Sequence, residues 1–92
     1  MRKPEQHLVT SGRFELERDG HIAYLDYKLG GGVLELMHTE VPQAMRGTGI
    51  GSEIVHTALE FARRDNLRVD VVCPFVAEYI ERHPEYADLV MK

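Results

Sequence analysis

Apolar and polar side chains alternate through the first part of the chain, which is typical of strands with one buried face. Residues 13–18, RFELER, follow this pattern and predict a strand with Phe14 and Leu16 facing inward. Asp19-Gly20 comes directly afterwards, and this dipeptide favours a tight turn because both residue types tolerate a positive φ. The pattern therefore predicts the first half of a β-hairpin.

The alternation continues on the far side of this turn. Residues 21–29, HIAYLDYKL, place four apolar side chains on one face: Ala23, Leu25, Tyr27 and Leu29. Gly30–Gly32 then predict a second reversal. Residues 33–41, VLELMHTEV, predict a third strand, which Pro42 ends because proline cannot donate to a ladder. We expect an antiparallel meander of three strands, with a further short strand at residues 7–10.

The hydrophobic period becomes helical over residues 48–64. The apolar residues that fall on one side of this predicted helix are Ile50, Ile54, Ala58, Phe61 and Ala62. The polar residues on its other side are Glu53, Thr57, Glu60 and Arg64. Asn66 follows, and asparagine is a suitable helix stop because it tolerates the left-handed conformation. The segment predicts one amphipathic helix.

The C-terminal part of the chain predicts a strand, a helix and a packed tail. Residues 68–73, RVDVVC, are rich in β-branched side chains, which favours a short strand. Residues 74–82 begin with a proline, which suits the first position of a helix, and this helix must end before Pro84. We expect Tyr86 and Leu89 in the tail to pack on the core.

Length and composition are those of one small domain with one modest core. The chain has 92 residues, of which 43% are hydrophobic and 28% are charged, and we expect a single domain over residues 1–92. The predicted order of elements is β-β-β-α-β-α, which indicates an α+β fold rather than an alternating α/β one.

Charge and cysteine content argue against several kinds of partner. The net charge of −4 and the isoelectric point near 5.7 disfavour broad nucleic-acid binding, which depends on basic contacts to phosphates. The single cysteine, Cys73, allows no internal disulfide, and the histidines lack the spacing of a zinc site. MRKPEQHLV at the N-terminus is not followed by the apolar run of a signal peptide, and no run approaches the roughly 20 residues of a membrane span. We therefore expect a cytoplasmic protein with no metal, nucleic acid or membrane as partner.

Three alternating glycines lie between the third strand and the first helix. Gly47, Gly49 and Gly51 leave the backbone open to a ligand, at the point where unpaired amides meet the positive end of the helix dipole. Arg46, one residue earlier, can add a contact to a phosphate oxygen. This arrangement indicates a pyrophosphate site. The alternative is a loop whose glycines only permit a sharp turn and close helix packing.

Two common phosphate-binding motifs do not fit this loop. A Walker loop requires a lysine before the Ser or Thr, but Ser52 directly follows a glycine. GTGIGS also departs from the G-x-G-x-x-G spacing of dinucleotide-binding folds, although Asp70 lies at about the right distance to imitate their ribose-binding acid. Such a fold begins with its glycine-bearing unit and continues through parallel ones, whereas here three hairpin strands come first.

RGTGIG, residues 46–51, fits the Q/R-x-x-G-x-G/A pattern of the GCN5-related N-acetyltransferases. The chain resembles in particular a small subfamily of acetyltransferase-like proteins of about its own length. The resemblance extends to HTEVP, residues 38–42, and to CPFVAEYIERHPEYADLV, residues 73–90, and these blocks together cover roughly half of the chain. It implies a minimal acetyltransferase fold, in which a splayed parallel strand follows the helix after the meander.

The same resemblance implies a site for acetyl-CoA as cosubstrate. The pyrophosphate-binding residues would be Arg46, Gly47, Thr48, Gly49, Ile50 and Gly51. The strand end at Thr39, Glu40 and Val41 would bind the pantetheine arm as a further strand does, and one of its backbone amides would meet the thioester carbonyl oxygen. Compared with larger family members, we expect no long C-terminal extension here, and this expectation leaves the acceptor side of the site undefined.

His38 and Glu40 are candidates for acid–base chemistry, because they lie two residues apart on one face of the third strand. Either could take a proton from the amine, directly or through water. The alternatives are a core histidine bonded to backbone and a solvated carboxylate at a sheet edge. Glu35 is predicted to lie on the opposite face.

Cys73 and Tyr79 are further candidates on the C-terminal segment. Cys73 ends a strand just before a helix N-terminus, a position that lowers a thiol pKa, so its thiolate could relay the acetyl group. The alternative is a small buried thiol. Tyr79 could protonate the leaving thiolate, but its helical spacing with Val76 and Ile80 equally fits a core position.

The resemblance therefore predicts an acetyl-CoA-binding domain that transfers acetyl to a primary amine of a small molecule or a protein. One alternative is a non-catalytic acyl-CoA-binding or sensing module, and another is an interaction domain whose glycine loop binds nothing. The sequence leaves the acceptor and the oligomeric state open.

Overall fold

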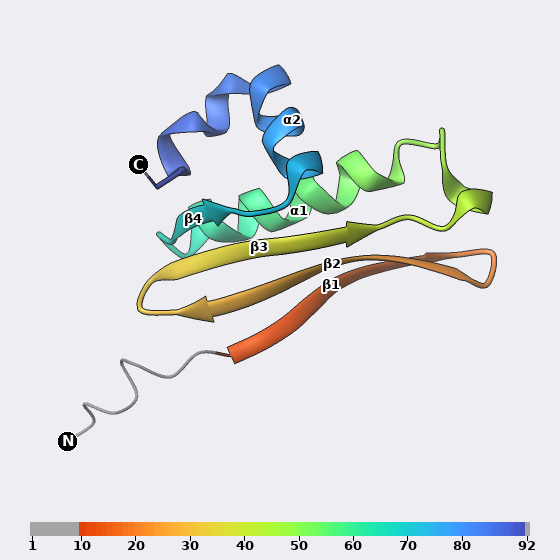
Figure 1. Ribbon diagram of the computed structural model, residues 1–92, viewed down its shortest axis with the longest axis horizontal. Helices are drawn as coiled ribbons and strands as arrows, with labels where there is room; N and C mark the ends of the chain where they lie inside the picture. Colours follow the sequence, from red (N-terminus) through yellow and green to blue (C-terminus); the bar gives the residue numbers. More distant parts are fainter. Residues whose placement is uncertain (1–9, 92) are drawn as a thin grey trace.

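The computed structural model describes residues 10–91 and contains the predicted order of elements, β-β-β-α-β-α. Four strands form one sheet in the order β1-β2-β3-β4 (Figure 1). The strands are β1 (Thr10–Arg18), β2 (His21–Gly30), β3 (Val33–Glu40) and β4 (Arg68–Val71). The helices are α1 (Ile50–Arg64) and α2 (Pro74–Arg82), with short 3-10 helices η2 (Gln43–Met45) and η3 (Pro84–Leu89).

Two tight turns connect the antiparallel meander. Asp19 and Gly20 both have a positive φ, of 52° and 80°, as the predicted hairpin requires. Gly31 and Gly32 do the same in the second turn, with φ of 59° and 79°. Strand β1 begins earlier than predicted, and of the short strand expected at residues 7–10 all but the last residue lie outside the described part.

Strands β3 and β4 pair in parallel and then separate. Val33–Leu36 pair with Arg68–Val71, after which the amides of Val72 and Cys73 both donate to the Leu36 carbonyl, at 3.0 and 3.1 Å. The chain then leaves the sheet, so β4 ends before the predicted Cys73. Within residues 10–91, the rest of β3 has β2 on one side and no strand on the other. The predicted splayed parallel strand is confirmed.

A β-bulge at Met37 interrupts the pairing of β2 with β3. Tyr27 pairs with Leu36, whereas the preceding residue, Asp26, pairs with His38, so Met37 is the extra residue of β3. A bulge bends its strand and increases the local twist. It lies at the point where β3 leaves β4 and continues alone beside β2.

The bulge also decides which side chains share a face of the sheet. Glu35 pairs with Lys28 before the bulge, and His38 pairs with Asp26 after it. Because Lys28 and Asp26 lie two residues apart on the same strand, Glu35 and His38 lie on the same face, together with Glu40. The prediction that Glu35 lies on the opposite face is therefore wrong. It counted residues by strict alternation, and the extra residue reverses that alternation.

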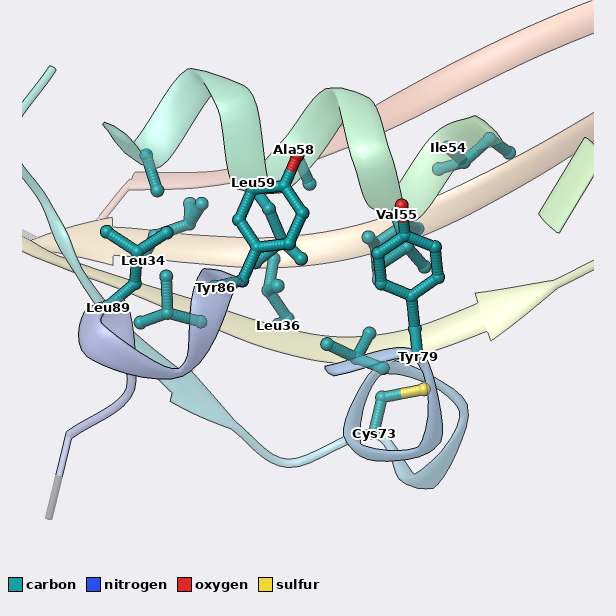
Figure 2. Close-up of a cluster of buried hydrophobic side chains, with 14 of the residues drawn as sticks. Leu34, Leu36, Ile54, Val55, Ala58, Leu59, Cys73, Tyr79, Tyr86 and Leu89 are labelled. Atoms are coloured by element: carbon teal, nitrogen blue, oxygen red, sulfur yellow. The ribbon is translucent and has the colours of Figure 1, made fainter. Parts of the chain in front are cut away.

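Both helices and η3 pack on one face of the sheet and form the core with it (Figure 2). The inward face of α1 differs in part from the prediction, because Val55 and Leu59 are fully buried whereas Phe61 is only partly buried. Phe61 lies at the flank of the helix, with its ring centroid 5.8 Å from that of Phe14 on β1. Tyr86 and Leu89 are buried, as predicted for the tail.

The C-terminal segment also closes the outer edge of the sheet. Val90 forms a parallel bridge with Val69 of β4, and the Met91 amide donates to the Val69 carbonyl at 2.9 Å. None of the described helices has both the length and the apolar character needed to cross a membrane.

Candidate functional site

A groove of about 430 Å³ lies between the N-terminus of α1, the unpaired end of β3 and the start of α2. Its lining residues are Thr39, Glu40, Val41, Met45, Arg46, Gly47, Gly49, Ile50, Gly51, Ser52 and Phe75. All predicted cofactor-binding residues except Thr48 belong to this set. Thr48 instead donates its hydroxyl to the Met45 carbonyl at 2.5 Å, which holds the loop from within.

The N-terminus of α1 presents unpaired backbone donors. The first helical hydrogen bond runs from the Glu53 amide to the Gly49 carbonyl at 3.0 Å, and no side chain within residues 10–91 caps this end. The amides of Ile50, Gly51 and Ser52 therefore have no acceptor within the helix. All three residues line the groove, where the positive end of the helix dipole favours an anion.

The three glycines serve two different structural purposes. Gly47 and Gly49 have φ of +81° and +83°, and a Cβ at either position would meet no atom within 4 Å. These two glycines are required by the backbone conformation, and they leave its outer side open. A Cβ at Gly51 would come within 2.9 Å of Phe75 Cζ and 3.4 Å of Val41 Cγ2, so that glycine allows the Phe75 ring to pack against α1.

Arg46 joins the glycine loop to the end of β3. Its Nε donates to the Val41 carbonyl at 3.0 Å, which fixes the base of the guanidinium at the groove. Within residues 10–91 Arg46 forms no ion pair, so its terminal nitrogens can donate to an anionic ligand. A guanidinium beside open amides is suited to a phosphate group.

His38 and Glu40 form a pair on the face of the sheet that the helices leave open. His38 Nε2 lies 3.1 Å from Glu40 Oε1, and the side chains are 58% and 46% exposed. The reading of His38 as a core histidine bonded to backbone is therefore wrong. Glu40 is also among the residues that line the groove, so the pair lies next to it.

Cys73 lies beside the groove but does not line it. The residue is only 4% exposed and belongs to the buried cluster that Figure 2 shows. Its Sγ lies 3.3 Å from the hydroxyl oxygen of Thr39, a residue that lines the groove.

The surroundings of Cys73 favour the thiolate in spite of burial. Burial acts to raise the pKa of the thiol, but the Thr39 hydroxyl and the nearby backbone amides of Val76, Phe75 and Thr39 outweigh it. The pKa of Cys73 consequently lies below its ordinary value, although no amide makes a regular capping bond to the sulfur. The lowered pKa raises the thiolate fraction at a given pH, although the residue remains buried.

Tyr79 is a core residue in this structure. Its side chain is 5% exposed and its ring stacks on His83, with centroids 4.1 Å apart. Burial raises the pKa of its hydroxyl, which disfavours release of a proton. Tyr79 is not among the residues that line the groove.

Three groove residues were not predicted from the sequence: Met45, Ser52 and Phe75. Ser52 directly follows the glycine motif and could have been included on that ground. Met45 and Phe75 are brought to the groove by η2 and α2, and no local sequence pattern predicts that these two residues line it. Among the described residues, no three histidine, cysteine, aspartate or glutamate side chains are grouped so that they could hold a metal ion.

Comparison with known sequences identifies relatives of this chain. A family model described as GCN5-related N-acetyltransferase matches residues 13–89. The chain is also similar to protein NATD1 from Bos taurus, with 36% identity over 56 residues, and to NATD1 from Homo sapiens, with 34% over the same length. Each match covers 61% of this chain and 50% of the relative, so the chain spans about half the length of the curated relatives it matches.

Two solved structures share the fold. An acetyltransferase from Bacillus cereus has a TM-score of 0.66 at 15% identity, over 90% of this chain and 63% of that one. A GCN5-like protein from Staphylococcus aureus has a TM-score of 0.66 at 21% identity, over 94% of this chain and 89% of that one. At these identities the likeness concerns the fold alone, and it confirms the predicted α+β architecture.

Proposed function

The chain belongs to the GCN5-related N-acetyltransferase family, and from that premise we propose that it binds acetyl-CoA in the groove and transfers the acetyl group to a primary amine. One observation carries the proposal: a single groove combines open helix amides, a guanidinium and a strand edge that no other strand of residues 10–91 pairs. These features suit the pyrophosphate and the amide-rich arm of one ligand.

The two ends of the groove would bind different parts of acetyl-CoA. At one end, the amides of Ile50, Gly51 and Ser52 and the guanidinium of Arg46 would donate to the pyrophosphate oxygens. At the other end, the backbone of β3 after the bulge would pair with the pantetheine amides, since β4 has left the sheet there. An amide of this segment would also stabilise negative charge on the thioester oxygen during attack.

The His38–Glu40 pair would prepare the acceptor for that attack. An amine is protonated at neutral pH and must lose a proton before it becomes nucleophilic. Glu40 lies at the groove and His38 lies 3.1 Å from it, so the pair can accept this proton and pass it to solvent. The neutral amine would then bond to the acetyl carbon as the bond to the CoA sulfur breaks and CoA leaves as a thiolate. The extra proton on the nitrogen would pass to that thiolate or to solvent, which yields the neutral amide.

A relay through Cys73 is the competing route. The Cys73 thiolate would bond to the acetyl carbon and displace the CoA thiolate, and the amine would later take the acetyl group and release Cys73. The lowered pKa of the thiol supports this route, whereas the burial of Cys73 supports direct transfer. Cys73→Ala separates them: direct transfer retains turnover, and the relay loses both turnover and an acetylated species in intact-mass spectra.

A non-catalytic acyl-CoA-binding module is the second candidate function. The observation that favours it is the exposed acceptor side, where His38 and Glu40 face solvent and the described residues provide no opposite wall. Such a module would bind acetyl-CoA and transfer nothing to any amine. The binding experiment below therefore precedes any test of turnover.

Calorimetric titration with acetyl-CoA, with NAD and ATP as comparison ligands, tests the binding. We expect saturable binding of acetyl-CoA and a loss of about tenfold or more for Arg46→Ala, because a charge-assisted hydrogen bond contributes about 1.5–3 kcal/mol. Arg64→Ala is the matched control, since Arg64 is an exposed arginine at the far end of the same helix. The proposal would be contradicted if none of the three ligands binds, or if the two variants lose the same amount of affinity for acetyl-CoA.

A further inference from the structure

One face of the sheet carries no helix among the described elements, because α1, α2 and η3 all pack on the other. The side chains that the strand register places on this open face include six acidic and three basic groups, which leaves a net charge of −3. These are Glu15, Glu17, Asp26, Glu35, Glu40 and Asp70, with Arg13, Lys28 and Arg68. The face is therefore charged, acidic and open to solvent.

We propose that the acyl acceptor is a lysine side chain of a basic polypeptide that lies across this open face. The inference rests on the proposed function and specifies its substrate class. Two observations carry it: Glu40 both lines the groove and belongs to the open face, which no described helix covers, and the charged side chains of that face sum to −3.

The open geometry favours a macromolecular acceptor over a small amine. Pockets for small ligands bury about 70–90% of the ligand surface, which requires walls on several sides. Here His38 and Glu40 remain 58% and 46% exposed beside the groove. A free amine would have little to bind beyond this pair, whereas a polypeptide brings additional surface that can lie along the strands.

Acidic side chains lie on both sides of Tyr24 on the way to the groove, and the Arg13 guanidinium, paired with Asp26, lies over the Tyr24 ring. Glu15 pairs with Tyr24 and Tyr24 with Glu40, so the three side chains form one row across β1, β2 and β3. Glu17 follows on the same face of β1, opposite the half-exposed Ile22. Basic residues that flank a target lysine would meet this row, and such charge complementarity raises the rate of association.

Charge reversal at a distance from the groove tests the inference. Glu15→Lys/Glu17→Lys changes the open face on β1, and Glu78→Lys/Glu81→Lys makes the same change in net charge at exposed positions of α2. The acceptors are a lysine peptide with flanking arginines, the same peptide with flanking glutamates, and N-acetyl-lysine amide as a small amine. Acetyl-CoA affinity is measured for each variant by calorimetry.

We expect kcat/KM for the arginine-flanked peptide to exceed that for the small amine, and to fall about tenfold or more in the β1 variant at low salt. The α2 variant should retain most of that activity, and the small amine should be affected little in both. Added salt should narrow the difference between the two peptides.

Equal kcat/KM for all three acceptors, or equal losses in the two variants, would overturn the inference while leaving acetyl transfer intact. Turnover of the small amine alone would have the same meaning. If acetyl-CoA fails to bind, the proposed function itself is wrong, and the calorimetric arm reveals this separately. If acetyl-CoA binds but no acceptor is modified, the inference falls and the non-catalytic module is favoured.

Discussion

The two ends of α1 differ in the hydrogen bonds that the rest of the molecule forms with them. At the N-terminal end, Gly49 caps the helix in a left-handed conformation, none of the described side chains bonds to the first amides, and a groove lies in front of them. Towards the C-terminal end, Arg63 donates to Asp88 at 3.0 Å and to the Glu85 carbonyl at 2.8 Å, which ties the helix to η3.

Tyr86 strengthens the attachment of this second end. Its buried hydroxyl donates to Glu60 Oε2 at 2.5 Å and lies 3.1 Å from His56 Nδ1, so η3 is joined to two successive turns of α1. The contrast shows how a small domain can leave one helix end unsatisfied. Packing and polar contacts along the rest of α1 fix the helix, and its free amides remain available for a ligand.

The largest effect on stability should come from removal of the Tyr86 side chain, which joins η3 to α1. Tyr86→Ala removes a side chain that is 4% exposed, and we expect the free energy of unfolding to fall by about 3–5 kcal/mol. Acetyl-CoA affinity of the folded fraction should change little, because Tyr86 does not line the groove. Denaturant unfolding and calorimetry at low temperature measure the two quantities. Should Tyr86→Ala not fold, Tyr86→Leu keeps an apolar side chain in place, and a large loss of affinity there would break the separation of the two ends.

A substitution at the N-terminal end of α1 should lower the affinity for acetyl-CoA as well as the stability. Gly49→Ala and Gly20→Ala introduce the same strain, since φ is +83° and +80° and neither new Cβ meets an atom within 4 Å. Each should cost about 1–2 kcal/mol of stability, because both place a Cβ in the left-handed conformation. Only Gly49→Ala should weaken acetyl-CoA binding in calorimetry. Equal affinities for the two variants would mean that the glycine loop serves the turn only.

The pH dependence of stability should test the contacts of the Tyr86 hydroxyl with α1. Burial and the hydrogen bond to Glu60 raise the pKa of Tyr86 to about 12 from an ordinary 10. The unfolded chain therefore loses this proton first, and stability that is fully present below pH 10 is lost as the pH rises towards 12. Tyr86→Phe removes this part of the alkaline loss, which denaturant unfolding at pH 9 and pH 11 would detect. Parallel pH profiles for the two proteins would contradict the assignment.

The smallest effect is expected at the ion pair beside the open end. Arg18 Nη2 lies 3.0 Å from Glu53 Oε1, and both side chains are about half exposed, so Glu53→Gln should change stability by less than about 1 kcal/mol. Because a carboxylate in the first turn competes with any other anion for the helix N-terminus, acetyl-CoA should bind slightly more tightly to this variant. Glu78→Gln on α2 is the control. Weaker binding by Glu53→Gln alone would indicate that Glu53 positions the loop.

The elements of the fold could be predicted because local residues determine where each begins and ends. The Asp19-Gly20 turn, the stop at Pro42 and the break before Pro84 all lie where expected. The bulge at Met37 could not be predicted, since VLELMHTE contains no local feature that distinguishes it from a regular strand. The error at Glu35 followed directly from that omission.

The candidate site divides in the same way. The loop from Arg46 to Gly51 was found because its residues are consecutive and their chemistry is local. Phe75 and the contact between Thr39 and Cys73 join segments far apart in the chain, and only the tertiary structure brings them together. Which ligand the site binds stays a prediction.

The bulge at Met37 changes which residues of β3 face the core. Before it, even-numbered residues such as Leu34 and Leu36 face the core; after it, Thr39 does, because it pairs with the buried Leu25. The orientation of every β3 side chain after Met37 therefore depends on this extra residue. Grafted onto a regular strand with Leu34 and Leu36 inward, it would turn Thr39 outward and bury Glu40, so a transplant of the site must carry the bulge with it.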